Sequence, residues 1–335
     1  MVNISDVARK AGLSVSTVSR VLNHKPHVSP QKEILVKEAM ADLGYRPMTA
    51  ARQLRGSNAR TLAVTVPRIT NPFFANLVDM IEQVLDQAGY TTVLIQTFGR
   101  GDKELAALDL LQSQSVEGVI LCSIENEPEL IQSYNKFGQL LLVNEYRSDL
   151  QLPTVRADQY QGFRRATLKL LDRGYRRIAY VTGHHQEAVS TKVTANLNHD
   201  RLTGYQAALR ARGQVWDPDL MFTQVKTATE GKKLLQDIWQ QPVRPDAIIS
   251  GSDEVAIGIL EAARVQGIRV PQELGVLGVD DQPLSNDLFI PLTTLQQPTT
   301  QLGSAAAQTM LQLLQGEKVA QEQVFDLRLV LRQSI

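Results

Sequence analysis

The sequence has little of several residue types, and each shortage excludes a class of protein. Among its 335 residues only Cys122 is a cysteine, which rules out an intrachain disulfide and a Cys-x-x-Cys metal site and fits a reducing cytosol. No apolar run is long enough to span a bilayer, and the N-terminus lacks the apolar stretch of an export signal. We therefore expect a cytoplasmic protein that binds no metal and enters no membrane.

The motifs that identify common enzymes are also missing. The chain has no G-x-S-x-G nucleophile elbow, no G-x-x-x-x-G-K-[ST] phosphate loop, no G-x-G-x-x-G after the first expected strand and no H-E-x-x-H zinc motif. His184 and His185 are adjacent, so they would point in different directions and suit a metal-ligand pair poorly. Residues 198–201 include His, Asp and Arg, but no nucleophile can be placed beside them. We expect neither an enzyme nor a bound cofactor.

The net charge of zero conceals an uneven distribution of charge. Residues 1–60 hold ten Lys or Arg against four Asp or Glu, whereas the rest of the chain holds 25 basic and 31 acidic residues. A basic head suits a polyanion such as DNA, because neutralised phosphates release their condensed counterions. An ordinary solvated surface would explain the charge equally well, so other features must decide.

Three short helices are expected in this basic head. Asn3 is placed to cap the first helix and Gly12 to end it, and Ser14 is placed to cap the second. A short turn then joins the two as in a helix-turn-helix, and Ser29-Pro30 opens a third helix that Gly44 ends. The residues expected to form the small core recur at helical spacing: Ile4, Val7, Ala8, Ala11, Val18, Val21, Leu22, Ile34, Leu35, Ala39 and Leu43.

From Thr61 onward, apolar strands alternate with amphipathic helices, which predicts an α/β fold with parallel sheets and right-handed crossovers. These strands are too many for one small sheet, and a break near residues 145–159 suggests two similar lobes. In sheets of this kind ligands bind beyond the carboxyl ends of the strands. The strands are expected at 61–67, 91–97, 116–123, 139–145, 177–183, 246–253 and 274–280.

The outer side of the second helix is suited to reading DNA. Arg20 can bind guanine with two hydrogen bonds, Ser16 can donate or accept, and the methyl groups of Val15 and Thr17 can contact thymine. An ordinary polar surface helix is the alternative. The residues expected at bases or at nearby phosphates are Val15, Ser16, Thr17, Arg20, Asn23, His27 and Ser29.

Eight short motifs follow one another along nearly the whole chain: ISDVARKAGLSVSTVSRVLN, VSPQ, LGYRP, ARQLRG, NPFFANL, RLTGYQAAL, GVDDQPLS and PLTTLQQP. In this order they resemble the motifs of the LacI/GalR (lactose-repressor) family of bacterial transcription regulators. The resemblance implies a helix-turn-helix head at 1–46, a hinge at 47–60 and a two-lobed core like a periplasmic sugar-binding protein at 61–335. The N-lobe would hold about 61–158 and 293–318, and the C-lobe about 159–290 and 319–335.

The same resemblance gives the hinge a role in DNA binding. Residues 47–56 favour a helix but are too few to hold one alone in water, so we expect them to order on DNA. Leu54 matches a leucine that wedges into the minor groove at the operator centre, and Arg55 lies beside it. Met48 stands where relatives often have Asn, which removes a helix cap that Thr49 could replace. A homodimer would read a roughly palindromic operator.

The resemblance further implies a pocket between the lobes for a small-molecule effector, which in this family is a carbohydrate or a related molecule. Arg201 matches the arginine that grips ligand oxygens, and Asp280 matches the acid that accepts hydroxyl protons. Phe73 and Phe74 match an aromatic pair that packs on a ligand ring, although both could instead belong to the core. Gln297 completes the set.

Three further pocket positions depart from the family pattern. Asn144 stands where many relatives have Asp, and Ser252 stands where many have Asn, so the hydrogen-bond pattern should differ from that of the common sugar pocket. Lys226 falls near a position that is often aromatic. A positive charge there would favour an anionic or phosphorylated effector.

Together these features predict a sequence-specific repressor of carbohydrate-utilisation genes that a small sugar or sugar derivative controls. Within the same class, the alternative is a catabolite-type regulator whose DNA binding is promoted by a phosphocarrier protein. From another class, the alternative is a solute-binding protein without a DNA function. The basic head and the missing export signal argue against it.

Overall fold

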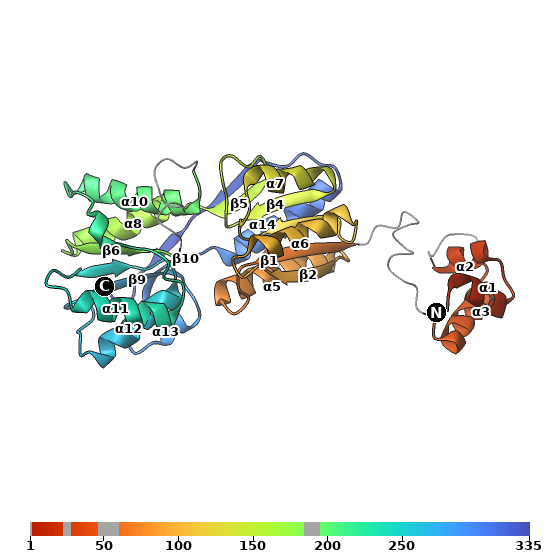
Figure 1. Cartoon of the computed structure of the whole chain (residues 1–335), viewed down its shortest axis with the longest axis horizontal. Helices are drawn as coiled ribbons and strands as arrows, with labels where there is room; N and C mark the ends of the chain where they lie inside the picture. The colour runs from red at the N-terminus through yellow and green to blue at the C-terminus, as the bar shows by residue number, and fades with distance from the viewer. Residues whose placement is uncertain (1, 23–27, 46–59, 184–194) are drawn as a thin grey trace.

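The computed structural model describes residues 2–22, 28–45, 60–183 and 195–335 and comprises a helical head and two α/β lobes (Figure 1). We call the lobes the N-lobe (60–157 and 298–326) and the C-lobe (158–297 and 327–335, except 184–194). None of the helices in these ranges is long and apolar enough to cross a membrane. The predicted fold class, a helical head followed by two lobes with mainly parallel sheets, is confirmed.

The helices of the head begin and end at the predicted residues. The side chain of Asn3 accepts hydrogen bonds from the backbone N–H groups of Ser5 and Asp6, and Asp6 accepts one from the N–H of Asn3, which completes a capping box. Gly12 and Gly44 follow their helices with φ of 66° and 62°, a left-handed conformation that glycine adopts at little cost. The helices are α1 (Ile4–Ala11), α2 (Val15–Leu22) and α3 (Pro30–Leu43).

The core of the head differs from the expectation in α3. Ile34 and Leu35 are 56% and 42% exposed, whereas Val36 is fully buried. Val36 lies three positions before Ala39 and four before Met40, so the buried stripe is centred on these residues and Leu43. Leu35, four positions before Ala39, lies at the edge of this stripe, and Ile34 falls outside it. The buried residues of this core are Val7, Ala8, Val18, Val21, Val36 and Ala39.

The N-lobe is built on a parallel sheet of six strands in the order β11-β5-β4-β3-β1-β2. Its apolar strands are paired in register, for example with Val64 of the first strand beside Leu94 and Ile120. In chain order the elements are β1 (Thr61–Val66), α5 (Pro72–Gln87), β2 (Thr91–Gln96), α6 (Gly101–Gln112), β3 (Gly118–Leu121), α7 (Pro128–Ser133), the 3-10 helix η1 (Tyr134–Lys136), β4 (Gln139–Val143), β5 (Thr154–Ala157), α14 (Thr299–Leu314) and β11 (Glu322–Phe325).

The C-lobe repeats this plan in the order β12-β10-β9-β8-β6-β7, with only the β10–β12 pair antiparallel. Its elements are α8 (Gln159–Asp172), β6 (Ile178–Val181), α10 (Leu197–Ala211), the 3-10 helix η2 (Pro218–Leu220), β7 (Met221–Phe222), α11 (Ala228–Trp239), β8 (Ala247–Ile249), α12 (Asp253–Val265), β9 (Gly275–Asp280), α13 (Leu284–Asp287), β10 (Thr293–Gln296) and β12 (Arg328–Val330).

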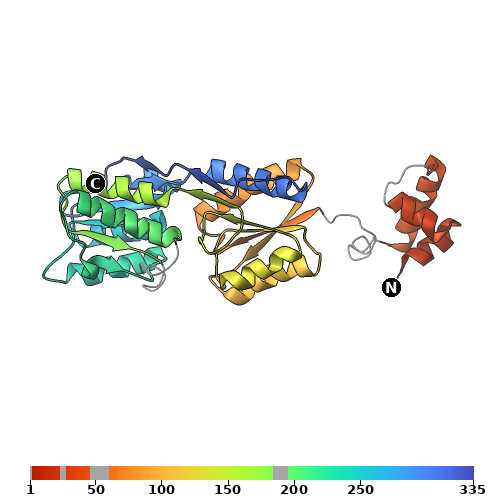
Figure 2. The same cartoon turned by 90° about the horizontal axis from the view of Figure 1, so that it is seen from above.

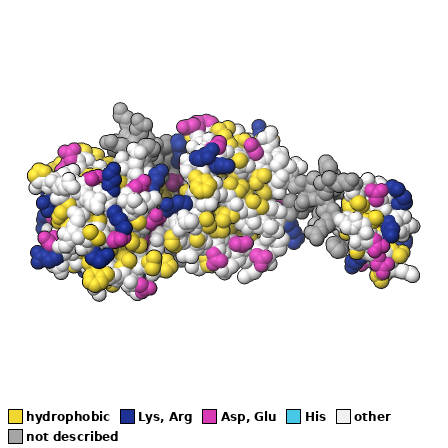
Figure 3. All heavy atoms as spheres, turned by 60° about the horizontal axis from the view of Figure 1, so that its bottom comes forward, with side chains coloured by type: hydrophobic (Ala, Val, Ile, Leu, Met, Phe, Trp, Pro, Cys, Tyr) yellow, Lys and Arg dark blue, Asp and Glu magenta, His cyan; other side chains and the backbone are white. Residues whose placement is uncertain are grey.

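Helices cover both faces of each sheet, so each lobe has two hydrophobic cores (Figure 2). In the N-lobe, α5 and α14 pack on one face and α6 with α7 on the other. In the C-lobe, α8 and α10 pack on one face and α11 with α12 on the other. Hydrophobic side chains also reach the surface of both lobes (Figure 3), among them Val93 and Leu94 of the edge strand β2 and Phe289 after α13.

Two short segments lie in the opposite lobe from the one expected. Thr293–Gln296 was expected in the N-lobe, but as β10 it pairs with β9 of the C-lobe. Glu322–Phe325 was expected in the C-lobe, but as β11 it pairs with β5 of the N-lobe. Both strands have four residues and lie next to a crossing between lobes, so only their tertiary contacts decide the sheet. The hydroxyl of Thr294, for instance, donates to Asp253 of the C-lobe at 2.6 Å.

Candidate functional site

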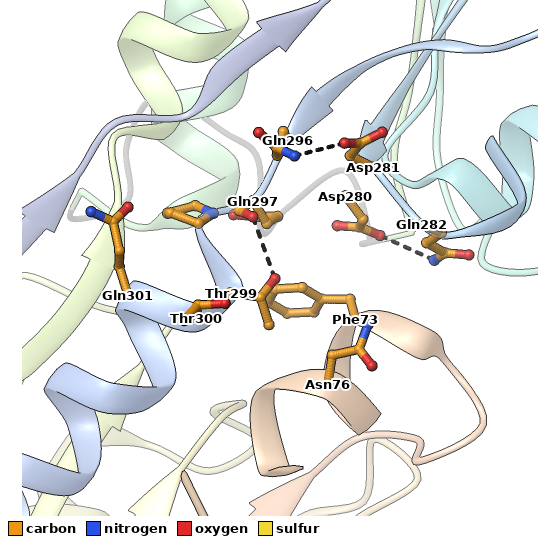
Figure 4. Close-up of a pocket in the computed structure, with 11 residues that line it drawn as sticks. Phe73, Asn76, Asp280, Asp281, Gln282, Gln296, Gln297, Thr299, Thr300 and Gln301 are labelled. Atoms are coloured by element: carbon orange, nitrogen blue, oxygen red, sulfur yellow. Dashed lines mark hydrogen bonds between the residues drawn. The ribbon is translucent and has the colours of Figure 1, made fainter. Parts of the chain in front are cut away.

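A cavity of about 370 Å³ lies where the two lobes face each other (Figure 4). Its C-lobe wall comes from the carboxyl ends of β9 and β10, and its N-lobe wall comes from the first turns of α5 and α14. This is where open parallel sheets bind ligands. The lining residues are Phe73, Asn76, Asp280, Asp281, Gln282, Gln296, Gln297, Pro298, Thr299, Thr300 and Gln301.

The C-lobe wall is held by a buried carboxylate beneath it. Asp253, the first residue of α12, is fully buried and accepts hydrogen bonds from Ser285 Oγ and Thr294 Oγ1, each at 2.6 Å, and from the backbone N–H of Gln282 at 2.8 Å. Burial raises the pKa of Asp253 to about 6 in spite of these donors. Gly278 leaves room for this carboxylate, because a Cβ there would lie 2.1 Å from Asp253 Oδ1.

The two carboxylates at the end of β9 have different surroundings. Asp281 forms an ion pair with Arg332 at 2.7 Å and accepts from Gln296 Nε2 at 2.8 Å, so its charge is balanced. Asp280 accepts from Gln282 Nε2 at the longer distance of 3.4 Å. Removal from water and the neighbouring Asp253 raise the pKa of Asp280 well above its ordinary value, and the positive charge of Arg201 opposes this.

The backbone at this end of β9 is also unusual. Asp280 and Asp281 have φ of 116° and 56°, in the region that residues other than glycine seldom adopt. Such conformations cost about 1–3 kcal/mol each and tend to occur at functional sites. The neighbouring strand β10 is in register here, with Gln296 beside Asp280, which brings the polar ends of both strands to one place.

The lobes touch each other next to the cavity. Gln282 Nε2 donates to Asn71 Oδ1 at 3.1 Å, and Asn71 also caps α5 by accepting from the N–H of Phe73 at 3.0 Å. Arg68, which follows β1, forms an ion pair with Glu254 in the first turn of α12. A change in the angle between the lobes would therefore alter the cavity and these contacts together.

Three residues predicted for the pocket line the cavity, namely Phe73, Asp280 and Gln297. Gln297 is 4% exposed, and its Oε1 has no partner among the described residues. Phe74 does not line the cavity; its ring packs on the N-lobe core and meets the edge of Phe73 with the ring centroids 5.0 Å apart. Of the aromatic pair, only Phe73 is placed to contact a ligand in this cavity.

Arg201 and Asn144 lie outside the lining of the cavity, but both are polar groups in confined surroundings. Arg201 Nε donates to Gln159 Oε1 at 2.8 Å, and its Nη1 donates to the carbonyl oxygen of Gly251 at 3.2 Å. Its charge acts on both Asp280 and Glu145, and it helps to limit the rise in the pKa of Glu145, which burial brings to about 7. Asn144 follows β4 with φ of 67°, and its Oδ1 is buried without a partner in the described chain.

Ser252 and Lys226 also lie outside this cavity. Ser252 is the N-cap of α12 and accepts from the N–H of Val255, so its hydroxyl has a structural partner. Lys226 is exposed, with its stem against Gly183 and its backbone N–H bonded to Glu230. The structure therefore does not place the expected positive charge of Lys226 in the wall of the cavity.

Sequence reasoning missed most of the polar residues of the wall. Gln282 and Gln296 lie within family-like motifs, and Thr299 directly follows one, which was an available signal. The missed lining residues are Asn76, Asp281, Gln282, Gln296, Pro298, Thr299, Thr300 and Gln301.

The predicted DNA-reading side of the head is exposed at the start of α2. Val15 is 41% exposed, and Ser16 and Arg20 are also exposed, whereas Thr17 is partly buried. Ser14 Oγ lies 2.9 Å from Ser16 Oγ and 2.8 Å from Thr17 Oγ1. Among the described residues no ion pair involves Arg20. A polyanion could therefore reach this guanidinium directly.

The remaining predicted residues of the head and hinge divide into two groups. Ser29 is the exposed N-cap of α3, and in the described head its hydroxyl makes no capping hydrogen bond. The other residues lie outside the described ranges: Asn23, His27, Leu54 and Arg55, as well as His184 and His185.

Comparison with known proteins gives matches along nearly the whole chain. Residues 3–48 match the model of bacterial regulatory proteins of the lacI family, and residues 59–327 match that of periplasmic binding proteins and the sugar-binding domain of the LacI family. The HTH-type transcriptional repressor CytR of Escherichia coli K12 is 30% identical over 333 residues, which cover 99% of this chain and 95% of CytR.

Two solved structures extend these matches to three dimensions. The lac repressor dimer bound to operator and the anti-inducer ONPF is 26% identical with a TM-score of 0.80, over 99% of this chain and 98% of that one. A LacI family regulator from Lactobacillus casei with bound glucose is 33% identical with a TM-score of 0.73, over 82% of this chain and 99% of that one. Proteins of this kind are transcription regulators and not enzymes, as the sequence predicts. The chain belongs to the LacI family of DNA-binding transcription regulators.

Proposed function

We propose that this regulator acts in the cytoplasm as a homodimer and represses carbohydrate-utilisation genes under the control of a small sugar or sugar derivative. The observation that carries the proposal is the cavity shared between the lobes. Phe73 and Asn76 come from the N-lobe, and Asp280 and Gln297 come from the C-lobe. A ligand that contacts both walls binds one arrangement of the lobes better than another, which is the requirement for an effector.

The lining of the cavity favours a carbohydrate as this effector. Apart from Phe73 and Pro298, its residues are carboxylates, carboxamides and threonines, which exchange hydrogen bonds with hydroxyl groups. Its volume of about 370 Å³ lies at the lower end of the range for small-molecule sites. The related regulator from Lactobacillus casei has glucose bound, which supports a ligand of this size and chemistry.

The head and the outer surface support the DNA and dimer parts of the proposal. We propose that Val15, Ser16, Thr17 and Arg20 read base edges and that Leu54 wedges into the minor groove. The lac repressor, which is similar along the whole chain, binds its operator as a dimer. Figure 3 shows hydrophobic side chains gathered on the surface of the N-lobe, and a contiguous surface of this kind is a common mark of contact with another subunit.

An operator titration with and without sugars tests the proposal. The operator is first obtained by selection from random duplexes with the full-length protein, and sugars are then screened by thermal shift. A ligand at 100 times its dissociation constant should stabilise the protein by about 2.7 kcal/mol. A stabilising sugar that leaves operator affinity unchanged would contradict control by that sugar. The catabolite-type alternative predicts instead that operator affinity rises when a phosphocarrier protein is added.

A further inference from the structure

The hydrogen-bonding capacity left free at one side of the cavity consists of acceptors. Figure 4 shows Asp280 and Gln297 above the ring of Phe73. Gln297 Oε1 is buried and has no partner among the described residues. The carboxylate of Asp280 receives only a long hydrogen bond of 3.4 Å from Gln282 Nε2 and further donation from the side chain of Gln297. A ligand that satisfies this corner must therefore bring donors.

No lysine or arginine belongs to the described lining of the cavity. Three arginines close to the walls lie outside this lining and make hydrogen bonds to other groups. Arg332 pairs with Asp281, Arg68 pairs with Glu254, and Arg201 donates to Gln159 Oε1 and to the carbonyl of Gly251. A phosphate group carries only acceptors and negative charge at neutral pH, so it would face Asp280 with no cation in the described lining to contact it directly. The cavity is therefore poorly suited to a sugar phosphate.

A protonated amine has the opposite properties. An ammonium group offers three donors and no acceptor, and its charge strengthens a hydrogen bond to a carboxylate. It is also attracted to the face of an aromatic ring. Asp280, Gln297 and Phe73 supply one carboxylate, one free amide oxygen and one ring at the same corner (Figure 4).

The following inference rests on the proposed role of this cavity as the effector site. We propose that the effector is a polyhydroxylated molecule of sugar size that carries a protonated amine, which binds between Asp280, Gln297 and Phe73. The amide and hydroxyl groups elsewhere in the wall bind its hydroxyls, and phosphorylated sugars are excluded.

The electrostatics of Asp280 agree with a cationic ligand. Burial and Asp253 raise the pKa of Asp280, and Arg201 offsets part of this rise. The other nearby acid, Asp281, is paired with Arg332. An ammonium group beside Asp280 lowers its pKa again, so binding should release a proton wherever Asp280 is protonated in the free protein.

The test uses sugars in matched sets of three on the same carbon frame. One set is glucose, glucosamine and glucose 6-phosphate, and the corresponding galactose and mannose sets follow. Binding to the full-length protein is measured by calorimetry at pH 7. In at least one set the amine should bind roughly tenfold more tightly than the neutral sugar, and the phosphate should not bind. Repeating the titration in buffers of different ionisation enthalpy measures the released proton.

Two variants assign the preference to one carboxylate. Asp280→Asn keeps the shape of the side chain without its charge and should bring the ratio between amine and neutral sugar close to one. Asp287→Asn, which removes an exposed carboxylate of α13 outside the lining of the cavity, is the matched control and should retain the ratio. An unchanged urea unfolding curve followed by the fluorescence of Trp216 and Trp239, which pack on the cores of the C-lobe, shows that this lobe remains folded in both variants.

The outcomes separate this inference from the proposed function. The inference is overturned if the neutral sugar binds as tightly as its amine in every set that binds, if a phosphate binds, or if the ratio is unchanged in Asp280→Asn. If such a neutral or phosphorylated sugar also changes operator affinity, the proposed function stands without it. If no member of any set binds, both the inference and the proposed sugar effector fail.

Discussion

Replacement of Asp253 by Asn should change how the stability of the C-lobe depends on pH. Burial raises the pKa of Asp253 from its ordinary 3.8 to about 6, although Ser285, Thr294 and Gln282 all donate to it. Because the pKa is higher in the folded state, the folded protein binds this proton more tightly than the unfolded chain does. The contribution of Asp253 to stability is therefore greatest below about pH 4 and falls as the pH rises to about 6.

The size of the effect follows from the two pKa values. A difference of about 2 corresponds to about 3 kcal/mol of stability lost by the parent between pH 4 and pH 7. Asn has the same shape and keeps an acceptor for the N–H of Gln282, but it does not ionise. We expect a constant cost of about 1–2 kcal/mol for the altered hydrogen bonds to Ser285 and Thr294. In addition to this constant cost, the free energy of unfolding of the variant should rise relative to that of the parent by up to about 3 kcal/mol between pH 4 and pH 7.

The chain provides its own reporter for this measurement. Its two tryptophans, Trp216 and Trp239, both pack against cores of the C-lobe, so tryptophan fluorescence in urea reports the unfolding of the lobe that contains Asp253. The difference in free energy of unfolding between variant and parent is measured from pH 4 to pH 8, which cancels the other titrating groups. Asp237→Asn, which removes an exposed carboxylate of α11, is the control. A difference that stays constant, or that turns against the variant as the pH rises, would refute the reasoning.

Three other substitutions test separate parts of the molecule. Arg20→Ala should cost about 1–3 kcal/mol per half-site and relax the choice of one base, so selection from random duplexes that returns the parental motif would remove Arg20 from base reading. Gly278→Ala should destabilise the C-lobe by about 1–3 kcal/mol, because the new Cβ would lie 2.1 Å from Asp253 Oδ1. An unchanged urea midpoint would show that β9 can shift to make room for the methyl group with no loss of stability. Arg68→Gln should weaken effector binding up to about fivefold through loss of the ion pair with Glu254, and equal affinities in calorimetry would mean that the pair does not favour the arrangement of the lobes that binds the effector.

The parts of the fold that depend on residues close in the sequence could be predicted from the sequence. The caps at Asn3 and Gly12 and the apolar strands of both sheets have signals within a few residues of themselves. The sheet to which β10 and β11 belong has no such signal, because it depends on partners such as Asp253 for Thr294. The buried side of α3 was predicted wrongly for a similar reason. Val36 and Ile34 are both hydrophobic, and only the packing of the helix shows that the side chain of Val36 is buried and that of Ile34 is exposed.

The same distinction applies to the cavity. Phe73, Asp280 and Gln297 could be expected there because each lies in a motif that resembles the LacI family. Ser252 was also expected in the pocket, but its hydroxyl caps α12, which only the backbone geometry reveals. The role of Gln282 depends on Asn71, which lies 211 positions earlier in the chain, so no local pattern could have shown it.

The late positions of β11 and β12 have a consequence for the synthesis of the protein. These strands form the edges of the two sheets, and the ribosome makes them after almost everything else in both lobes. The core of the head comes entirely from residues 4–45, so the head can fold while most of the chain is still untranslated. Neither sheet is complete before residue 322 has emerged. A chain whose translation stops earlier would carry a folded head beside two unfinished lobes, and it could still reach DNA without any means of being released by a ligand.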